Sequence, residues 1–215
     1  MSDKIRFDDD FYKCAIAILS GLLWIFELVY MIGSFSAPSL SPVYEITKFV
    51  IVTAVLVAIC VLLYTDKESE AIVIGKMLIA YYIVARLLAF GRAIAIVYAS
   101  NTAIYKTAAV FELIANIGII ITIALVVYEQ VSGKEEDGFI FFSLGLFVIA
   151  SLVAMILFMC TFKATGSVAD FGDFGFSFEI KANNDIHWTY YIGCVIDYAL
   201  IPWLACTGYY FIKNF

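Results

Sequence analysis

The chain has 215 residues, of which 64% are hydrophobic and only 15% are charged, and its mean hydropathy is +0.98. A soluble domain of this size must turn a large share of its residues towards water, so it cannot hide this much apolar surface. The formal net charge of −6 and the absence of a basic cluster exclude nucleic acid as an expected partner. We therefore expect an integral membrane protein whose main partner is the lipid bilayer.

The N-terminal residues 1–12 read MSDKIRFDDDFY and predict a short acidic tail. A cleaved secretory signal requires a basic start and a small-residue cleavage site, and a mitochondrial transit peptide is rich in arginine. Neither pattern is found, so the first hydrophobic run is expected to remain as a spanning helix. Residues 13–215 are then expected to form a single transmembrane helical domain.

Six hydrophobic runs are long enough to cross a bilayer, which takes about 20 mostly apolar residues. In chain order they cover about 13–35, 47–64, 71–99, 107–128, 139–162 and 188–212. The third run contains Lys76, Arg86 and Arg92, and its length would allow it to be tilted or partly interfacial. The predicted fold class is an all-α polytopic membrane protein with about six transmembrane helices.

The basic residues near the ends of these runs indicate the orientation of the chain. With the N-terminus inside, seven of them lie on the inner side and four on the outer side. The inner set is Lys4, Arg6, Lys13, Lys67, Lys76, Lys134 and Lys213, and the outer set is Lys48, Lys106, Lys163 and Lys181. This excess favours both termini on the cytoplasmic side, unless one of the six runs does not span.

Residues 163–187 form the only long polar loop, and they predict an ordered extramembrane recognition segment. Phe174, Phe176, Phe178 and Ile180 alternate with smaller or polar residues, which is the period-two pattern of a short β-strand with one apolar face. The Asp-Phe-Gly triplets at residues 170–172 and 173–175 lack the other motifs of a kinase. These aromatic side chains are therefore candidates for contact with a partner, with the membrane interface or with the end of the helix bundle.

Five of the ionisable residues within the predicted spans are candidates for ion pairs or a polar path, because charges there are costly and usually face protein or water. They are Glu27, Arg86, Arg92, Glu112 and Asp197. Their depths, at about 1.5 Å per residue, favour pairing of Arg92 with Glu112 or Asp197, and of Arg86 with Glu27. These charges are interpreted either as ion pairs that fix the helices or as the lining of a polar path.

The motifs of enzymes and metal sites are absent from the sequence. His187 is the only histidine, and the five cysteines show no C-x-x-C spacing, so no metal ligand set, cofactor or catalytic residue is predicted. Cys160 and Cys194 lie at similar depths beside the long loop and are candidates for a disulfide on an oxidising side. The alternative is that both are small apolar residues.

The leading hypothesis is a non-enzymatic membrane protein that serves as an accessory or scaffolding subunit of a larger membrane protein complex. In this interpretation the intramembrane charges hold the helices together, and other membrane subunits contact the long loop. The alternative is a small channel or secondary transporter whose polar path uses Glu27, Arg86, Glu112 and Asp197.

Overall fold

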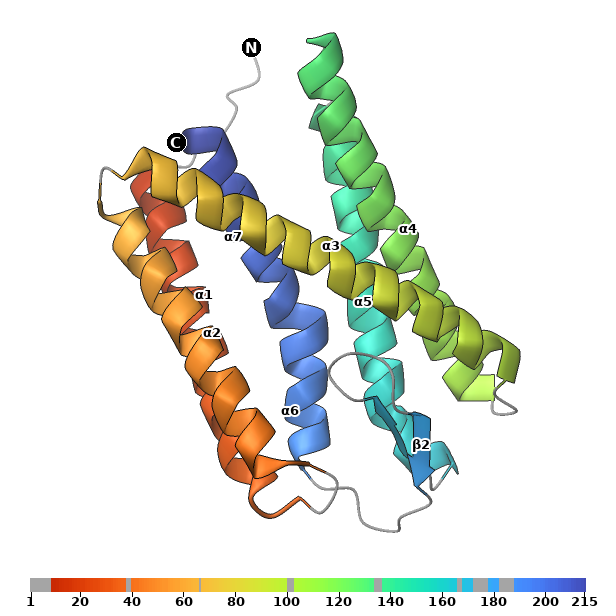
Figure 1. Ribbon diagram of the computed structural model, residues 1–215. Helices are drawn as coiled ribbons and strands as arrows, with labels where there is room; N and C mark the ends of the chain where they lie inside the picture. The colour runs from red at the N-terminus through yellow and green to blue at the C-terminus, as the bar shows by residue number, and fades with distance from the viewer. Residues whose placement is uncertain are drawn as a thin grey trace. The chain divides into compact units, whose positions relative to one another are not determined.

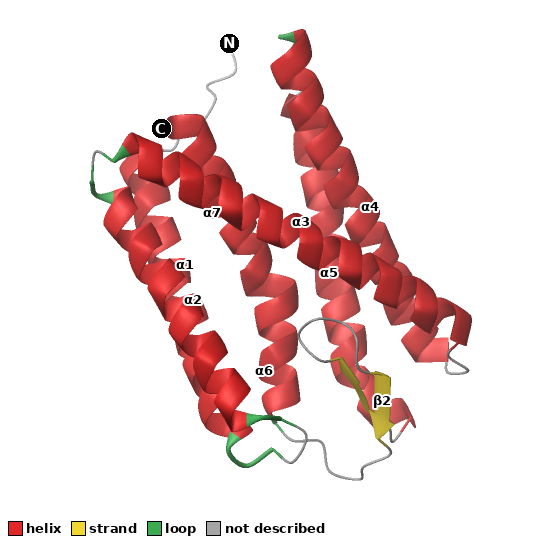
Figure 2. Cartoon of the chain, in the orientation of Figure 1, coloured by secondary structure: helices red, strands yellow, loops and turns green. Residues whose placement is uncertain are grey.

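The computed structural model describes residues 9–37, 40–65, 67–99, 103–133, 137–165, 168–171, 178–181 and 188–215. Helices account for nearly all of this length (Figures 1 and 2). In chain order the helices are α1 (Asp9–Ser34), α2 (Pro42–Leu63), α3 (Glu68–Ala99), α4 (Ala103–Ser132), α5 (Asp137–Thr165), α6 (Thr189–Val195), η1 (Ile196–Leu200) and α7 (Ile201–Asn214).

Within the described residues, six helical segments are long and apolar enough to cross a membrane. Five are α1 to α5, and the sixth is the continuous run of α6, η1 and α7 from Thr189 to Asn214. Each predicted hydrophobic run therefore corresponds to one such segment. Each of α1 to α5 begins a few residues before its apolar run, because polar residues can form the first turn of a helix where the hydropathy is still low.

Two short strands follow α5, namely β1 (Val168–Phe171) and β2 (Phe178–Lys181). They pair antiparallel, with Val168 opposite Lys181 and Phe171 opposite Phe178. The aromatic alternation predicts one strand from Phe174 to Ile180, but residues 172–177 lie outside the described part of the chain. That strand therefore stays a prediction. β2 begins only at Phe178 and pairs with a segment of the same chain.

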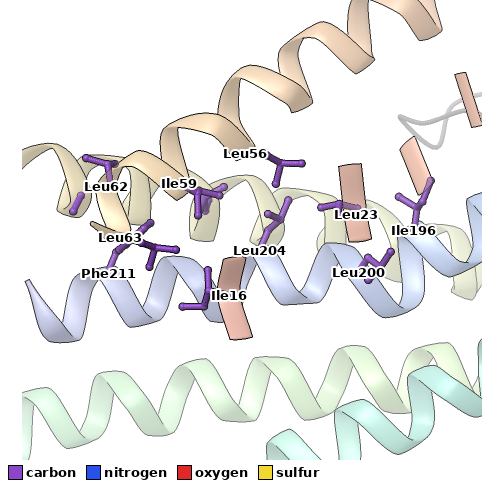
Figure 3. Close-up of a cluster of buried hydrophobic side chains, with 12 residues drawn as sticks. Ile16, Leu23, Leu56, Ile59, Leu62, Leu63, Ile196, Leu200, Leu204 and Phe211 are labelled. Atoms are coloured by element: carbon purple, nitrogen blue, oxygen red, sulfur yellow. The ribbon is translucent and has the colours of Figure 1, made fainter. Parts of the chain in front are cut away.

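The chain divides into two compact units. Unit 1 comprises residues 1–82 and 187–215, and unit 2 comprises residues 83–186. The core of unit 1 is a cluster of aliphatic side chains and Phe211, which converge from α1, α2, the first half of α3, η1 and α7 (Figure 3). Leu23, Ile59, Leu63, Ile196 and Phe211 are almost completely buried in this cluster.

A pair of glycines brings α3 and α7 into close contact within unit 1. A Cβ atom added at Gly75 would lie 2.7 Å from the carbonyl oxygen of Gly208, and a Cβ atom added at Gly208 would lie 2.7 Å from that of Gly75. Two backbones can approach this closely only where neither residue has a side chain. The crossing of α3 and α7 therefore depends on both glycines.

The last span contains a π-helix, η1, between α6 and α7. Pro202, the second residue of α7, has no backbone N–H, and its ring would collide with the carbonyl group four residues earlier in a regular α-helix. A wider π-turn before the proline accommodates this collision. Asp197 lies in this turn, and such π-turns are frequent at functional positions in helices.

Candidate functional site

The strongest polar contact of unit 2 joins α3 to α4. The Nη2 atom of Arg92 donates a hydrogen bond to Oε1 of Glu112 over 2.6 Å, and the Glu112 side chain is completely buried. The structure thus brings together one of the two pairings that the depths favour for Arg92. The short distance and the burial make this a charge-assisted contact in a low-dielectric environment.

Further polar side chains lie buried along the packing interface of α4 and α5. Thr122 and Ser143 share a hydrogen bond of 2.7 Å between their hydroxyl groups. The Nδ2 atom of Asn116 donates to the backbone carbonyl of Glu112 over 2.8 Å, which satisfies only one side of the amide. Asn116 and Ser151 are both almost fully buried. Unit 2 therefore contains a row of polar groups in an otherwise apolar interior.

Unit 1 also contains a buried carboxylate, that of Glu27 on α1. Its Oε2 atom lies 3.6 Å from Nζ of Lys48 on α2, and this ammonium group also lies 5.1 Å from the centre of the Tyr30 ring. Glu45, in the first turn of α2, is another buried carboxylate of this unit. Lys48 therefore links α1 to α2 through an ion pair and a cation–π contact.

Lys48 was predicted to lie at the membrane surface and not to pair with Glu27. The reason is that the second apolar run starts at Thr47, only one residue before Lys48. The helix actually begins at Pro42, and proline is favoured at the first position of a helix. The Ser41-Pro42 pair was therefore the signal that moves Lys48 one to two turns into α2 and towards Glu27.

A third link between α1 and α2 involves a residue that the sequence analysis did not consider. The indole Nε1 of Trp24 donates a hydrogen bond to Oγ1 of Thr53 over 3.1 Å. No motif marks this pair in the sequence, because each residue is common in membrane spans. The contact becomes visible only when the antiparallel alignment of α1 and α2 is known.

The other predicted intramembrane charges are divided between the two units. Arg86 is buried in α3 and belongs to unit 2, whereas Glu27, its predicted partner, belongs to unit 1 and pairs with Lys48. Asp197 is half-buried in η1 of unit 1. The ion pair of Arg92 and Glu112 joins two of the five predicted intramembrane charges.

The next candidates are the predicted partner-contact residues of the long loop and the two cysteines beside it. Phe174 and Phe176 lie outside the described residues, and Phe178 and Ile180 belong to β2. Cys160 lies in α5 of unit 2 and Cys194 in α6 of unit 1, so the disulfide considered between them stays a prediction. Cys194 is buried in α6, where it fits the alternative of a small apolar residue.

No group of three or more histidine, cysteine, aspartate or glutamate residues in the described ranges is placed to hold a metal ion. Comparison with known proteins found no match: no protein family, curated protein or solved structure matches the chain. What the chain does must therefore be inferred from its own polar contacts.

Proposed function

We propose that the chain is a non-enzymatic integral membrane protein that acts as an accessory or scaffolding subunit of a larger membrane protein complex. The observation that carries this proposal is the Arg92–Glu112 ion pair, in which a completely buried carboxylate is held at 2.6 Å by a residue of the neighbouring helix. A carboxylate bound in this way fixes the position of a helix and is poorly suited to release an ion. The Glu27–Lys48 pair has the same role between α1 and α2.

The surfaces of the helices support a role in assembly with other membrane subunits. Large apolar side chains are exposed on each of α1 to α5, for example Ile18, Val50, Met77, Val127 and Ile149. Such surfaces face lipid tails or the helices of other subunits. A scaffolding subunit requires helices that are held in position by contacts such as these ion pairs and that present apolar faces to other subunits.

The test is extraction of the protein from its native membrane in a gentle detergent, followed by measurement of the native mass. We expect a mass well above that of one chain, because partner subunits remain bound. A variant with Arg92→Leu should lose these partners, whereas Lys76→Leu, which changes an exposed charge of the same helix, should keep them. A monomer for the wild-type protein would overturn the proposal.

A small channel or transporter is a second candidate, favoured by the row of buried polar side chains in unit 2. This row extends from Glu112 and Asn116 to the Thr122–Ser143 hydrogen bond on α4 and α5. Reconstitution into vesicles distinguishes the two candidates. Flux that is abolished by Glu112→Gln, in a protein that still folds and assembles, would favour the transporter and count against a purely structural role of this carboxylate.

A further inference from the structure

The buried oxygen atoms of unit 2 include three that make no hydrogen bond with any described residue. They are Oε2 of Glu112, Oδ1 of Asn116 and Oγ of Ser151. Each of the three side chains is no more than 2% exposed. An unsatisfied polar atom at such a position is costly, so a group of three in one helix interface requires an explanation.

The helix geometry places these oxygens close to one another. The rings of Tyr105 on α4 and Phe158 on α5 meet with their centres 5.5 Å apart. Glu112 follows Tyr105 by seven residues, and Ser151 precedes Phe158 by seven residues. Seven residues are almost two complete helical turns, so Glu112 and Ser151 face each other across the antiparallel interface as Tyr105 and Phe158 do.

An independent contact gives the same alignment of α4 with α5. A Cβ atom added at Gly118 would lie 3.1 Å from both the Ser143 carbonyl oxygen and the Phe147 backbone nitrogen, so Gly118 lies opposite the turn between these two residues. Glu112 lies six residues before Gly118 on α4, and Ser151 lies six residues after the middle of the Ser143–Phe147 turn on α5. Because the two helices are antiparallel, Glu112 and Ser151 lie at the same level. Asn116 lies one turn from Glu112 on the same side of α4.

The orientations of the two α4 side chains are determined by their other contacts. Arg92 holds Oε1 of Glu112, which leaves Oε2 as the second acceptor of the carboxylate. Asn116 donates its Nδ2 hydrogen to the Glu112 backbone carbonyl, so its Oδ1 atom points away from that backbone. A flipped amide would bring two oxygens into contact, which excludes the opposite assignment.

We propose that Glu112, Asn116 and Ser151 form a binding site for a small neutral hydrogen-bond donor, in the first place a water molecule. Two acceptors and one hydroxyl group complement a molecule that donates two hydrogen bonds and accepts one. A metal cation fits less well, because Arg92 already neutralises Glu112 and Arg86 adds a second buried guanidinium to the same unit. This proposal does not depend on whether the chain is a subunit or a transporter.

The test is a double-mutant cycle on thermal unfolding of the full chain in detergent, with Asn116→Leu and Ser151→Ala. If one molecule bridges the two side chains, each substitution lowers the midpoint by about 2–4 °C, and the double variant loses clearly less than the sum. Thr122→Val with Ser143→Ala is the matched cycle for a direct hydrogen bond. Thr107→Val removes an exposed hydroxyl of α4 and should change nothing.

Several outcomes would overturn the site. A midpoint that stays constant or rises in Ser151→Ala would show that the hydroxyl has no partner to lose, and this variant decides the question even if Asn116→Leu does not fold. Strictly additive losses would exclude a shared ligand. A wild-type midpoint that falls when sodium chloride is replaced by choline chloride, with no such fall in Ser151→Ala, would identify a metal cation in place of a neutral donor.

Discussion

At the scale of single residues, Arg92 and Glu112 illustrate how burial decides the energy of an ion pair. We expect Arg92→Leu to lower the free energy of unfolding in detergent by about 3 kcal/mol or more, because it leaves the Glu112 carboxylate buried without its cation. The double variant Arg92→Leu with Glu112→Leu should recover most of this loss, since the Glu112 carboxylate is then no longer buried without its cation. If the double variant were as unstable as the single one, the pair would not be the source of the loss.

A smaller effect is expected for Lys48, whose side chain is 21% exposed and lies 3.6 Å from Glu27. Lys48→Met keeps most of the side-chain volume and removes both the ion pair and the contact with the Tyr30 ring. We expect a loss of about 1–2 kcal/mol in the free energy of unfolding, between the values for exposed and buried pairs. The matched control is Lys106→Met at an exposed position of α4, with a change below about 0.5 kcal/mol.

The same residues show how far the sequence predicts the site. Depth alone limits the predicted partner of Arg92 to Glu112 or Asp197, because a tight connection between α3 and α4 places Arg92 and Glu112 at one level and Asp197 lies at a comparable depth. Glu27 was identified as a buried charge, but its partner was missed, since the start of α2 was placed five residues too late. Asn116, Thr122 and Ser151 carry no charge, and the burial of Asn116 and Ser151 depends on which faces of α4 and α5 meet, as does the partner of Thr122.

At the scale of helices, the crossing of α3 and α7 gives the sharpest prediction. Gly75→Ala and Gly208→Ala would each place a methyl group 2.7 Å from a backbone oxygen that cannot move aside, so the helices must separate. We expect a loss of about 1–3 kcal/mol in the free energy of unfolding for each variant. A denaturant titration monitored by circular dichroism in detergent measures this loss.

Two other glycines provide controls for the same substitution. Gly21 in α1 and Gly91 in α3 have no heavy atom within 4 Å of the added Cβ position. Alanine forms helices better than glycine, so Gly21→Ala and Gly91→Ala should leave the protein unchanged or stabilise it by up to about 1 kcal/mol. Equal effects at all four positions would mean that helix propensity, and not the crossing, determines the result.

The helices also show which features of the fold hydropathy predicts. A run of about 20 apolar residues is sufficient to predict a span, because lipid allows few alternatives to a helix. The π-turn in the last span is different, since it changes the backbone geometry without changing the hydropathy. Pro202 was the available signal: a proline inside an apolar run predicts a local break of the regular hydrogen-bond pattern.

At the scale of the whole chain, the number of spans determines where the termini lie. If all six segments span, both termini lie on the same side of a membrane, and the count of lysines and arginines predicts the cytoplasmic side. A contact in unit 1 agrees with the first statement: the Tyr210 hydroxyl near the end of α7 donates a hydrogen bond to Asp9, the first residue of α1. The first turn of α1 and the last turns of α7 therefore lie at one end of this unit.

Epitope tags on intact cells test this topology, with one tag at each terminus and a third in the loop between α5 and α6. We expect antibodies to reach only the loop tag in intact cells and all three tags after permeabilisation, because an odd number of crossings separates the loop from each terminus. Access to one terminal tag alone would show that one of the six segments does not span. Access to both terminal tags, with the loop tag protected, would keep six spans and reverse the orientation that the basic residues favour.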